Sequence, residues 1–303
     1  MTAMDVHGVF PPIPTPFTDQ GIDRRALASN VSKWMQTKLS GIVVLGSNGE
    51  APLLEDHEAD VAIAAVREAV PSGRLLIAGT GRESTAATIT ATQRAARLGA
   101  DAVLVRTPSF FKNVMNTDAL VRHYTAVSDV SPVPVLLYNV TMYTGVNMLP
   151  DAVARLAEHP NIIGVKESGG DVGQLGEFVS RTPKDFRVLG GSATTFFAAL
   201  SVGASGGVLA LSAVLPDQCV QLYELVQQRL FDQARALQQR LTALARLLGA
   251  VHGIAGLKFA LDQVGYIGGP SRAPLGPLSP DAQRHIKEQL ALIEQGSGSP
   301  ARQ

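Results

Sequence analysis

The sequence is poor in cysteine and has no long apolar segment. Cys219 is the only cysteine among 303 residues, which excludes an intramolecular disulfide framework and a cysteine-based zinc site. A reducing compartment is the expectation, so we predict a cytoplasmic protein. No run approaches the roughly 18 uninterrupted apolar residues of a membrane-spanning helix, and Met1 to Gly8 resembles neither a secretory signal nor a transit peptide.

An excess of one charge and regular histidine spacings are also missing. Lysine and arginine total 26, as do aspartate and glutamate, so the chain lacks the basic excess of nucleic-acid-binding proteins. Its six histidines show no HxxxH or HxH spacing, which argues against metal ligation. No obvious pair of carboxylates follows the predicted strands, so glycosidase chemistry has no support. We expect no metal, membrane or nucleic acid as a partner.

The sequence does contain an alternation of short β-branched runs with longer helical patterns. This alternation is typical of βαβ units and favours a parallel sheet. Eight comparable units fit an α/β fold of the closed (β/α)8 TIM barrel type better than a doubly wound sheet, whose GxGxxG motif is absent after the first strand. The runs predicted as strands are Val9–Ile13, Gly41–Leu45, Leu75–Gly79, Ala102–Thr107, Val133–Tyr138, Ile162–Lys166, Phe186–Leu189 and Ser205–Leu209.

Helical patterns separate the predicted strands. Several begin with a residue whose side-chain oxygen can satisfy unpaired backbone donors, such as Ser84 or Thr117. The helices predicted between strands are Arg24–Thr37, Asp56–Ala69, Ser84–Leu98, Asp118–Asp129, Pro150–Glu158, Val172–Ser180 and Thr194–Val202.

Two further helical segments are predicted in the C-terminal part of the chain. Leu215–Leu248 and Ser279–Glu294 show amphipathic helical patterns, with no strand among them. We therefore predict a barrel over residues 1–215 and a C-terminal α-helical extension packed on it over residues 216–303. Within that extension, Gly296–Gln303 is predicted to be a frayed tail.

One lysine ends a predicted strand that should be buried on both faces. Lys166 closes its run, and the carboxyl ends of barrel strands form the active-site face. An unpaired ammonium in a poorly solvated interior is costly, so such an amine tends to lose its proton. A neutral amine can attack a ketone carbonyl. The alternative is that Lys166 extends into solvent and pairs with Glu167 or Asp171.

Other polar residues follow neighbouring predicted strands. Tyr138 ends the preceding run and could move protons beside Lys166, although taken alone it is typical of a core tyrosine. Ser47 and Asn48 lie in a glycine-rich turn whose hydroxyl, amide and backbone N–H groups suit a carboxylate. The segment Gly190–Ser192 ends the seventh run, where the absence of a side chain could admit substrate.

Three segments together resemble the dihydrodipicolinate synthase and N-acetylneuraminate lyase superfamily. They are Gly46–Glu50, Tyr138-Asn139 and Gly164–Asp171, and the resemblance covers nearly the whole chain. It implies a class I aldolase, a carbon–carbon lyase that needs no cofactor, forms a Schiff base with a small 2-oxo acid and is commonly a homotetramer.

Within this superfamily the chain is most similar to the 4-hydroxy-2-oxoglutarate aldolase branch. The segments that carry this similarity are Gly46–Glu50, Glu83–Thr88, His123–Val127, Ser168–Asp171 and Gly265–Leu275.

The resemblance also implies roles for single residues. Lys166 would form the imine and Tyr138 would donate and accept protons, while Ser47 and Asn48 would bind the carboxylate of the 2-oxo acid. Further substrate-binding residues are expected to be Ser168, Gly191, Ser192 and Leu209.

Two features depart from the family pattern. Tyr143 stands where synthases of lysine biosynthesis carry an arginine for the carboxylate of aspartate semialdehyde, which disfavours the synthase reaction. Phe110 and Phe111 occupy a segment where the family usually supplies a relay tyrosine from a neighbouring subunit. General acid–base help of that kind is often worth about 100-fold or more. We therefore expect either a slower enzyme or an acceptor pocket formed by Phe110, Phe111 and Tyr143.

Three functions remain open from the sequence. The first is aldol cleavage of a 4-hydroxy-2-oxo acid, such as 4-hydroxy-2-oxoglutarate or a 2-keto-3-deoxy sugar acid, with pyruvate held as an imine on Lys166. The second uses the same imine for 4-hydroxy-tetrahydrodipicolinate (dihydrodipicolinate) synthesis or for dehydration of a sugar acid. The third is a non-catalytic barrel that binds 2-oxo acids.

Overall fold

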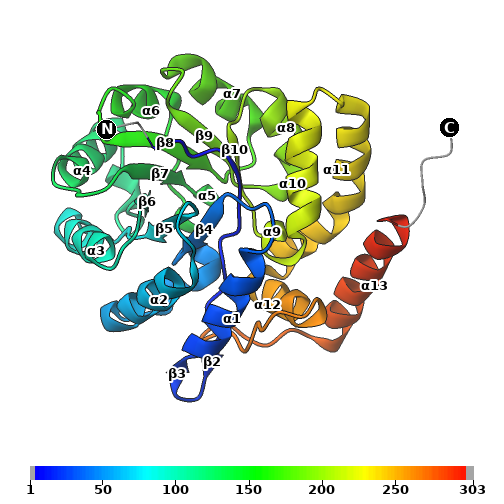
Figure 1. The fold of residues 1–303 in the computed structure, drawn as a ribbon. Coiled ribbons are helices and arrows are strands. Elements are labelled where there is room, and N and C mark those ends of the chain that lie inside the picture. Colours follow the sequence, from blue (N-terminus) through cyan, green and yellow to red (C-terminus); the bar gives the residue numbers. More distant parts are fainter. Residues whose placement is uncertain (1–3, 298–303) are drawn as a thin grey trace.

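Eight parallel strands form a nearly closed barrel in the computed structural model, which describes residues 4–297 (Figure 1). The ring closes where the Ile13 N–H donates to the Val43 carbonyl (2.9 Å) and the Val43 N–H donates to Pro11 (3.0 Å). The predicted (β/α)8 TIM barrel is confirmed. In spatial order the barrel strands are β1 (Gly8–Phe10), β10 (Gly206–Val208), β9 (Arg187–Gly190), β8 (Ile162–Glu167), β7 (Val135–Asn139), β6 (Ala102–Arg106), β5 (Leu75–Gly79) and β4 (Gly41–Val44).

Helices and short turns connect the strands and cover the outside of the barrel (Figure 1). A small antiparallel hairpin, β2 (Phe17–Thr18) and β3 (Gly21–Ile22), precedes the first helix. The helices are α1 (Arg24–Trp34), α2 (Asp56–Ala69), α3 (Thr85–Arg97), α4 (Thr117–Asp129), α5 (Thr141–Thr144), α6 (Pro150–Leu156), α7 (Val172–Arg181), α8 (Phe196–Ser201), α9 (Leu211–Val214), α10 (Pro216–Gln227), α11 (Phe231–Arg246), α12 (Gly253–Gln263) and α13 (Pro280–Ser297). The short turns are η1 (Ser47–Gly49), η2 (Ala51–Leu53), η3 (Lys112–Val114), η4 (Ala193–Thr195) and the π-helical η5 (Leu247–Val251).

Alternating side chains along the strands divide the core into two layers. Inward residues such as Val43 and Leu104 form one buried cluster. Their neighbours, such as Val44, belong to a larger cluster that includes helix residues such as Trp34. Because successive side chains of a strand point to opposite faces, a barrel strand must be apolar on both. Polar side chains are therefore tolerated only at the strand ends, where the barrel opens.

Among the predicted boundaries that differ from the structure, two have clear local reasons. Strand β1 ends at Phe10 rather than at Ile13, because Pro11 and Pro12 have no N–H to donate to a ladder. The helix predicted over Thr194–Val202 begins as the 3-10 turn η4, and regular α8 follows it.

One of the two predicted helix caps is confirmed. The Ser84 hydroxyl accepts from the Ala87 N–H (3.1 Å) at the start of α3. The predicted cap at Thr117 is wrong, because the Asn116 carboxamide accepts from the Ala119 N–H (3.0 Å) and Thr117 is already helical. Asn is among the strongest N-cap residues.

The C-terminal region contains more elements than predicted. The segment predicted over Leu215–Leu248 is divided by Arg229, whose φ of 61° is left-handed and ends the run of α10. Helix α12 was not predicted, since Gly253 and Gly256 lower its helix propensity. Burial of apolar residues such as Leu257 stabilises it instead.

The C-terminal helices pack on the barrel. Helix α10 contacts β1 and α8, and α11 contacts η4 beside the end of β9. Helix α13 extends to Ser297, into the predicted tail, and residues 298–303 lie outside the described part of the chain. The division into units at residues 215 and 216 stays a prediction.

Candidate active site

Lys166 lies inside the mouth of the barrel. It occupies the carboxyl end of β8, and its side chain is only 3% exposed. The Cα register pairs Lys166 with Tyr138 of β7, and Nζ lies 4.2 Å from the centre of the Tyr138 ring. No carboxylate of the described residues is within ion-pairing distance of Nζ. The alternative of an outward lysine paired with Glu167 or Asp171 is therefore wrong, and the amine borders a cavity.

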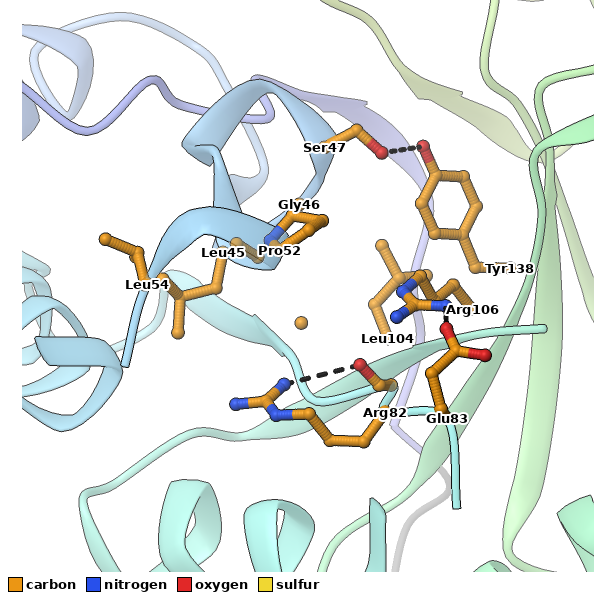
Figure 2. Close-up of a pocket in the computed structure, with 13 residues that line it drawn as sticks. Leu45, Gly46, Ser47, Pro52, Leu54, Arg82, Glu83, Leu104, Arg106 and Tyr138 are labelled. Atoms are coloured by element: carbon orange, nitrogen blue, oxygen red, sulfur yellow. Dashed lines mark hydrogen bonds and ion pairs between the residues drawn. The ribbon is translucent and has the colours of Figure 1, made fainter. Parts of the chain in front are cut away.

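Tyr138 and Ser47 bring two hydroxyl groups together beside this amine. The Tyr138 Oη and the Ser47 Oγ are 3.2 Å apart and share a hydrogen bond. Figure 2 shows the Ser47 side chain, from the turn after β4, directed at the phenol from the opposite side. Because Ser47 and Tyr138 are 91 positions apart, the closed barrel is what assembles this pair.

The turn that carries Ser47 and Asn48 is held in an uncommon backbone conformation. Leu45 and Glu50, which flank it, both have φ of 57°, in the left-handed region. Such non-glycine residues are strained and persist only where their surroundings hold them. Gly79 on β5 accommodates the bend, since a Cβ there would lie 1.9 Å from the Leu45 carbonyl oxygen.

Glu50 anchors this turn to the C-terminal helices. Its Oε1 lies 2.5 Å from the Lys258 Nζ of α12, and both side chains are at most 1% exposed. The Glu50 Oε2 accepts from the Arg272 N–H (2.7 Å), and Lys258 also donates to the Pro270 carbonyl (2.7 Å). Burial lowers the pKa of Lys258, which the Glu50 carboxylate opposes. The result is a buried ion pair behind the turn that bears Ser47.

The loop after β8 places a hydroxyl on the far side of the amine. The Ser168 Oγ is buried and has no hydrogen-bond partner among the described residues. It lies so close to the backbone of Gly191 that a Cβ there would approach it to 1.8 Å. The adjacent Glu167 points away from the cavity, accepting from Asn139 (2.7 Å) and from the Gly169 N–H. Burial raises the pKa of Glu167.

Most of the predicted site residues surround one cavity of about 330 Å³, which we call the Lys166 cavity. This arrangement joins the ends of β4, β7, β8 and β9 in one place. The predicted residues that line it are Lys166, Tyr138, Ser47, Asn48, Ser168, Gly191, Ser192 and Tyr143.

Three predicted residues do not line this cavity. Leu209 is fully buried in the core, and its neighbours Val208 and Ala210 face the cavity instead. Phe110 and Phe111 are 78% and 71% exposed at the surface. The expected acceptor pocket therefore includes Tyr143 but neither phenylalanine within this chain.

Glu83 holds the segment that carries Phe110 and Phe111 at the surface. Glu83 accepts from the backbone N–H groups of Ser109 and Phe110 (2.8 Å each) and pairs with Arg106 (2.8 Å). Although burial would raise the pKa of Glu83, these donors hold it at about 2. The segment before Phe111 is thus fixed to the outside of the barrel mouth.

The structure adds residues that the sequence did not reveal. Thr194 and Thr195 of η4 line the Lys166 cavity, and so do Arg246, Gly249 and Ala250 at the end of α11 and in η5. No local pattern identifies them, because α11 reaches the barrel mouth only through helix packing.

A second cavity, of about 340 Å³, lies on the other side of Tyr138 and Ser47. Figure 2 shows Arg82 and the Arg106–Glu83 pair on its wall. The turn Gly79–Ser84, which contributes to this wall, therefore lies beside the predicted site.

Neither a candidate metal cluster nor a membrane-spanning helix is found in residues 4–297. No group of three or more His, Cys, Asp or Glu side chains there is arranged to hold a metal ion. No helix in the same range is long and apolar enough to cross a membrane. The fold and site define a (β/α)8 barrel with a buried amine at its mouth.

Comparison with known proteins identifies the family. The model of the Dihydrodipicolinate synthetase family matches residues 5–293. The 4-hydroxy-tetrahydrodipicolinate synthase of Methanospirillum hungatei is 33% identical over 292 residues, covering 95% of this chain and 99% of that protein. The structure of the synthase from Methylacidiphilum fumariolicum is similar with a TM-score of 0.91 at 33% identity, covering 96% and 97%. A dihydrodipicolinate synthase from Acinetobacter baumannii, solved with pyruvate, has a TM-score of 0.91 at 29% identity, covering 95% and 99%.

The chain belongs to the dihydrodipicolinate synthetase family. Its members are Schiff-base-forming lyases of the class I aldolase type, so the predicted enzyme class, a carbon–carbon lyase, is confirmed. The relatives named above are synthases, and none is named as a 4-hydroxy-2-oxoglutarate aldolase. The predicted branch is therefore not specifically supported.

Proposed function

We propose that the protein cleaves a 4-hydroxy-2-oxo acid through an imine on Lys166. The observation that carries the proposal is a buried amine without a carboxylate partner among the described residues, opening into a cavity beside a tyrosine hydroxyl. Such an amine, free of a neutralising charge, is suited to capture a ketone. The pyruvate-bound relative from Acinetobacter baumannii shows that a family member accepts a small 2-oxo acid.

The positions of four side chains support the following proposed reaction. Ser47 and Asn48 hold the carboxylate, and the Lys166 Nζ adds to the C2 carbonyl and expels water. The protonated imine then accepts the electron pair of the C3–C4 bond. Tyr138 takes the proton of the 4-hydroxyl and an aldehyde leaves. Protonation of C3 and hydrolysis of the imine release pyruvate and restore the amine.

The chemistry of the cavity lining favours cleavage over synthesis. Aspartate semialdehyde, the acceptor of the synthase reaction, carries an ammonium group. No aspartate or glutamate among the described residues lines the Lys166 cavity to pair with it, and Tyr143 stands where synthases have an arginine. A 4-hydroxy-2-oxo acid has no such ammonium, so it needs no acidic partner.

Borohydride trapping tests this proposal directly. Reduction with pyruvate present should add a mass to the peptide containing Lys166, and a panel of 4-hydroxy-2-oxo acids should release pyruvate. Lys166→Arg should abolish both, whereas Lys184→Met, which removes an exposed lysine, should change neither. An unmodified wild-type protein would favour a non-catalytic barrel that binds 2-oxo acids.

A second candidate is 4-hydroxy-tetrahydrodipicolinate synthase, and it is favoured by the names of the similar proteins. It shares the Lys166 imine and differs in the acceptor. Incubation with pyruvate and aspartate semialdehyde distinguishes the two, because a dipicolinate-type product forming faster than any 4-hydroxy-2-oxo acid is cleaved would overturn the aldolase proposal. Dehydration of a sugar acid would instead yield a 2-oxo product without pyruvate release.

We further propose that the protein is cytoplasmic and forms a homotetramer. The lone buried Cys219 supports the first proposal, and the family resemblance supports the second. Exposed apolar side chains beside the barrel mouth, including Phe110 and Phe111, offer surface for such contacts. Sedimentation analysis at several concentrations should give a tetramer, and a monomer at every concentration would contradict it. One similar structure is of a monomeric synthase variant.

A further inference from the structure

Among the described residues, the Lys166 cavity is lined by two basic side chains and by no acidic one. Among the described residues its lining includes Lys166 and Arg246 but no aspartate or glutamate. The remaining polar groups are hydroxyls and amides, among them Ser192 and Thr194, whose oxygens are 2.8 Å apart. A cavity with this lining is suited to a ligand with more than one negative charge.

Arg246 reaches the cavity because of how α11 ends. It is the last residue of α11 and directly precedes the π-helical turn η5. Such turns are rare and occur frequently at functional sites. Within η5, Gly249 and Ala250 also line the cavity, and a Cβ added to Gly249 would meet no atom within 4 Å. Small residues thus leave this part of the cavity lining open.

The start of this arrangement is fixed by a buried amide. Gln238 of α11, 8% exposed, donates from Nε2 to the Ala193 carbonyl (2.9 Å) and accepts from the Phe197 N–H (2.9 Å). Both partners lie in the segment that follows β9. These bonds hold α11 against the loop that bears Ser192 and Thr194. The end of α11 that carries Arg246 is thereby kept beside the cavity.

Arg246 has no partner among the described residues that would neutralise it. Its side chain is exposed, and it makes no ion pair or hydrogen bond with the described residues. Arg240 and Arg235 of the same helix do have partners. A guanidinium that is left unpaired at a cavity mouth can form a bidentate pair with a ligand carboxylate.

We infer that Arg246 binds a second carboxylate, at the acceptor end of the substrate, so that the enzyme acts on dicarboxylic 2-oxo acids. This inference rests on the proposed function, in which the first carboxylate lies at Ser47 and Asn48. Those residues follow β4, whereas the loop beside Arg246 follows β9, across the barrel mouth in the strand order. A five-carbon diacid has its charges at its two ends, and a sugar acid with a neutral tail does not.

Calorimetric titration with two matched ligands tests the inference without requiring turnover. The probes are 2-oxoglutarate and 2-oxopentanoate, which share a five-carbon 2-oxo chain and differ in the second carboxylate. The wild-type protein should bind 2-oxoglutarate more tightly. Arg246→Met should remove about 10- to 100-fold of this preference, the range for a hydrogen-bonded charged group, and Arg246→Lys should keep part of it.

The control is Arg235→Met, which removes an arginine of the same helix that pairs with Asp232 outside the cavity. It should leave the preference intact. Equal binding of the two acids by the wild-type protein, or an unchanged preference in Arg246→Met, would overturn the inference. Failure of the proposed function is a separate result, because it is recorded as absence of the borohydride adduct at Lys166 whatever the binding preference.

Discussion

At the scale of single residues, the hydroxyl of Tyr138 is the atom best placed to move a proton beside Lys166. Tyr138→Phe keeps the ring against Nζ and removes only the Oη that is hydrogen-bonded to Ser47. We expect kcat to fall about 100-fold or more, as for other lost general acid–base groups, with little change in the melting temperature. Steady-state kinetics checks this prediction, with Tyr223→Phe on the outer helix α10 as the control variant. An unchanged kcat in Tyr138→Phe would remove Tyr138 from the mechanism.

Gly191 is the residue whose small size the site depends on most. A Cβ at this position would lie 1.8 Å from the Ser168 Oγ and 2.8 Å from the Glu167 carbonyl oxygen. Gly191→Ala should therefore displace the loop after β8, lower stability by about 1–3 kcal/mol and raise KM. Urea unfolding and kinetics measure both effects. Gly276→Ala, which meets no atom within 4 Å, is the control, and equal behaviour of the two variants would contradict the argument.

At the scale of elements, the buried pair of Glu50 and Lys258 couples α12 to the turn after β4. Removing one member of a buried ion pair leaves the other charge buried without a partner. This typically lowers the free energy of unfolding by about 3–5 kcal/mol. Lys258→Met should show this loss in urea unfolding and should also raise KM for the 2-oxo acid, because Ser47 belongs to the same turn.

The double variant Glu50→Gln/Lys258→Met is the matched comparison for that loss. It leaves no unpaired charge, so it should recover part of the stability lost in Lys258→Met. If the double variant lost as much stability relative to the wild type as Glu50→Gln and Lys258→Met lose together, the pair would not act as a unit.

At the scale of the whole molecule, stability should fall as the pH falls toward 4. His123 joins α3 to α4 through Thr85 (2.9 Å), and burial lowers the pKa of His123 to about 4. The unfolded chain therefore binds this proton more readily than the folded one. The stabilisation is fully present above the unfolded pKa of about 6.5 and is lost as the pH drops to about 4, a difference of about 3 kcal/mol.

Unfolding free energies measured in urea at pH 7 and at pH 4.5 test this prediction. His123→Gln should flatten the dependence on pH between these values, whereas His285→Gln, at an exposed position, should leave it unchanged. An equally steep dependence in His123→Gln would assign the acid sensitivity to other groups.

The sequence by itself determined the barrel and the centre of the candidate site. Strand alternation and helix periodicity are local properties, each visible within a few residues, and the right-handed connection of parallel strands limits how such units can join. Lys166 and Tyr138 were recognisable because polar side chains at the ends of apolar strands must meet at the barrel mouth.

Only the tertiary structure decided what lies around that centre. Glu50 finds Lys258, and Arg246 reaches the cavity, through packing of helices that are far from the strands along the chain. The same packing leaves Leu209 buried and Phe110 at the surface, so neither lines the Lys166 cavity of this chain. Contacts between distant segments depend on ring closure and on the geometry of the packed core, which no local pattern of residues encodes.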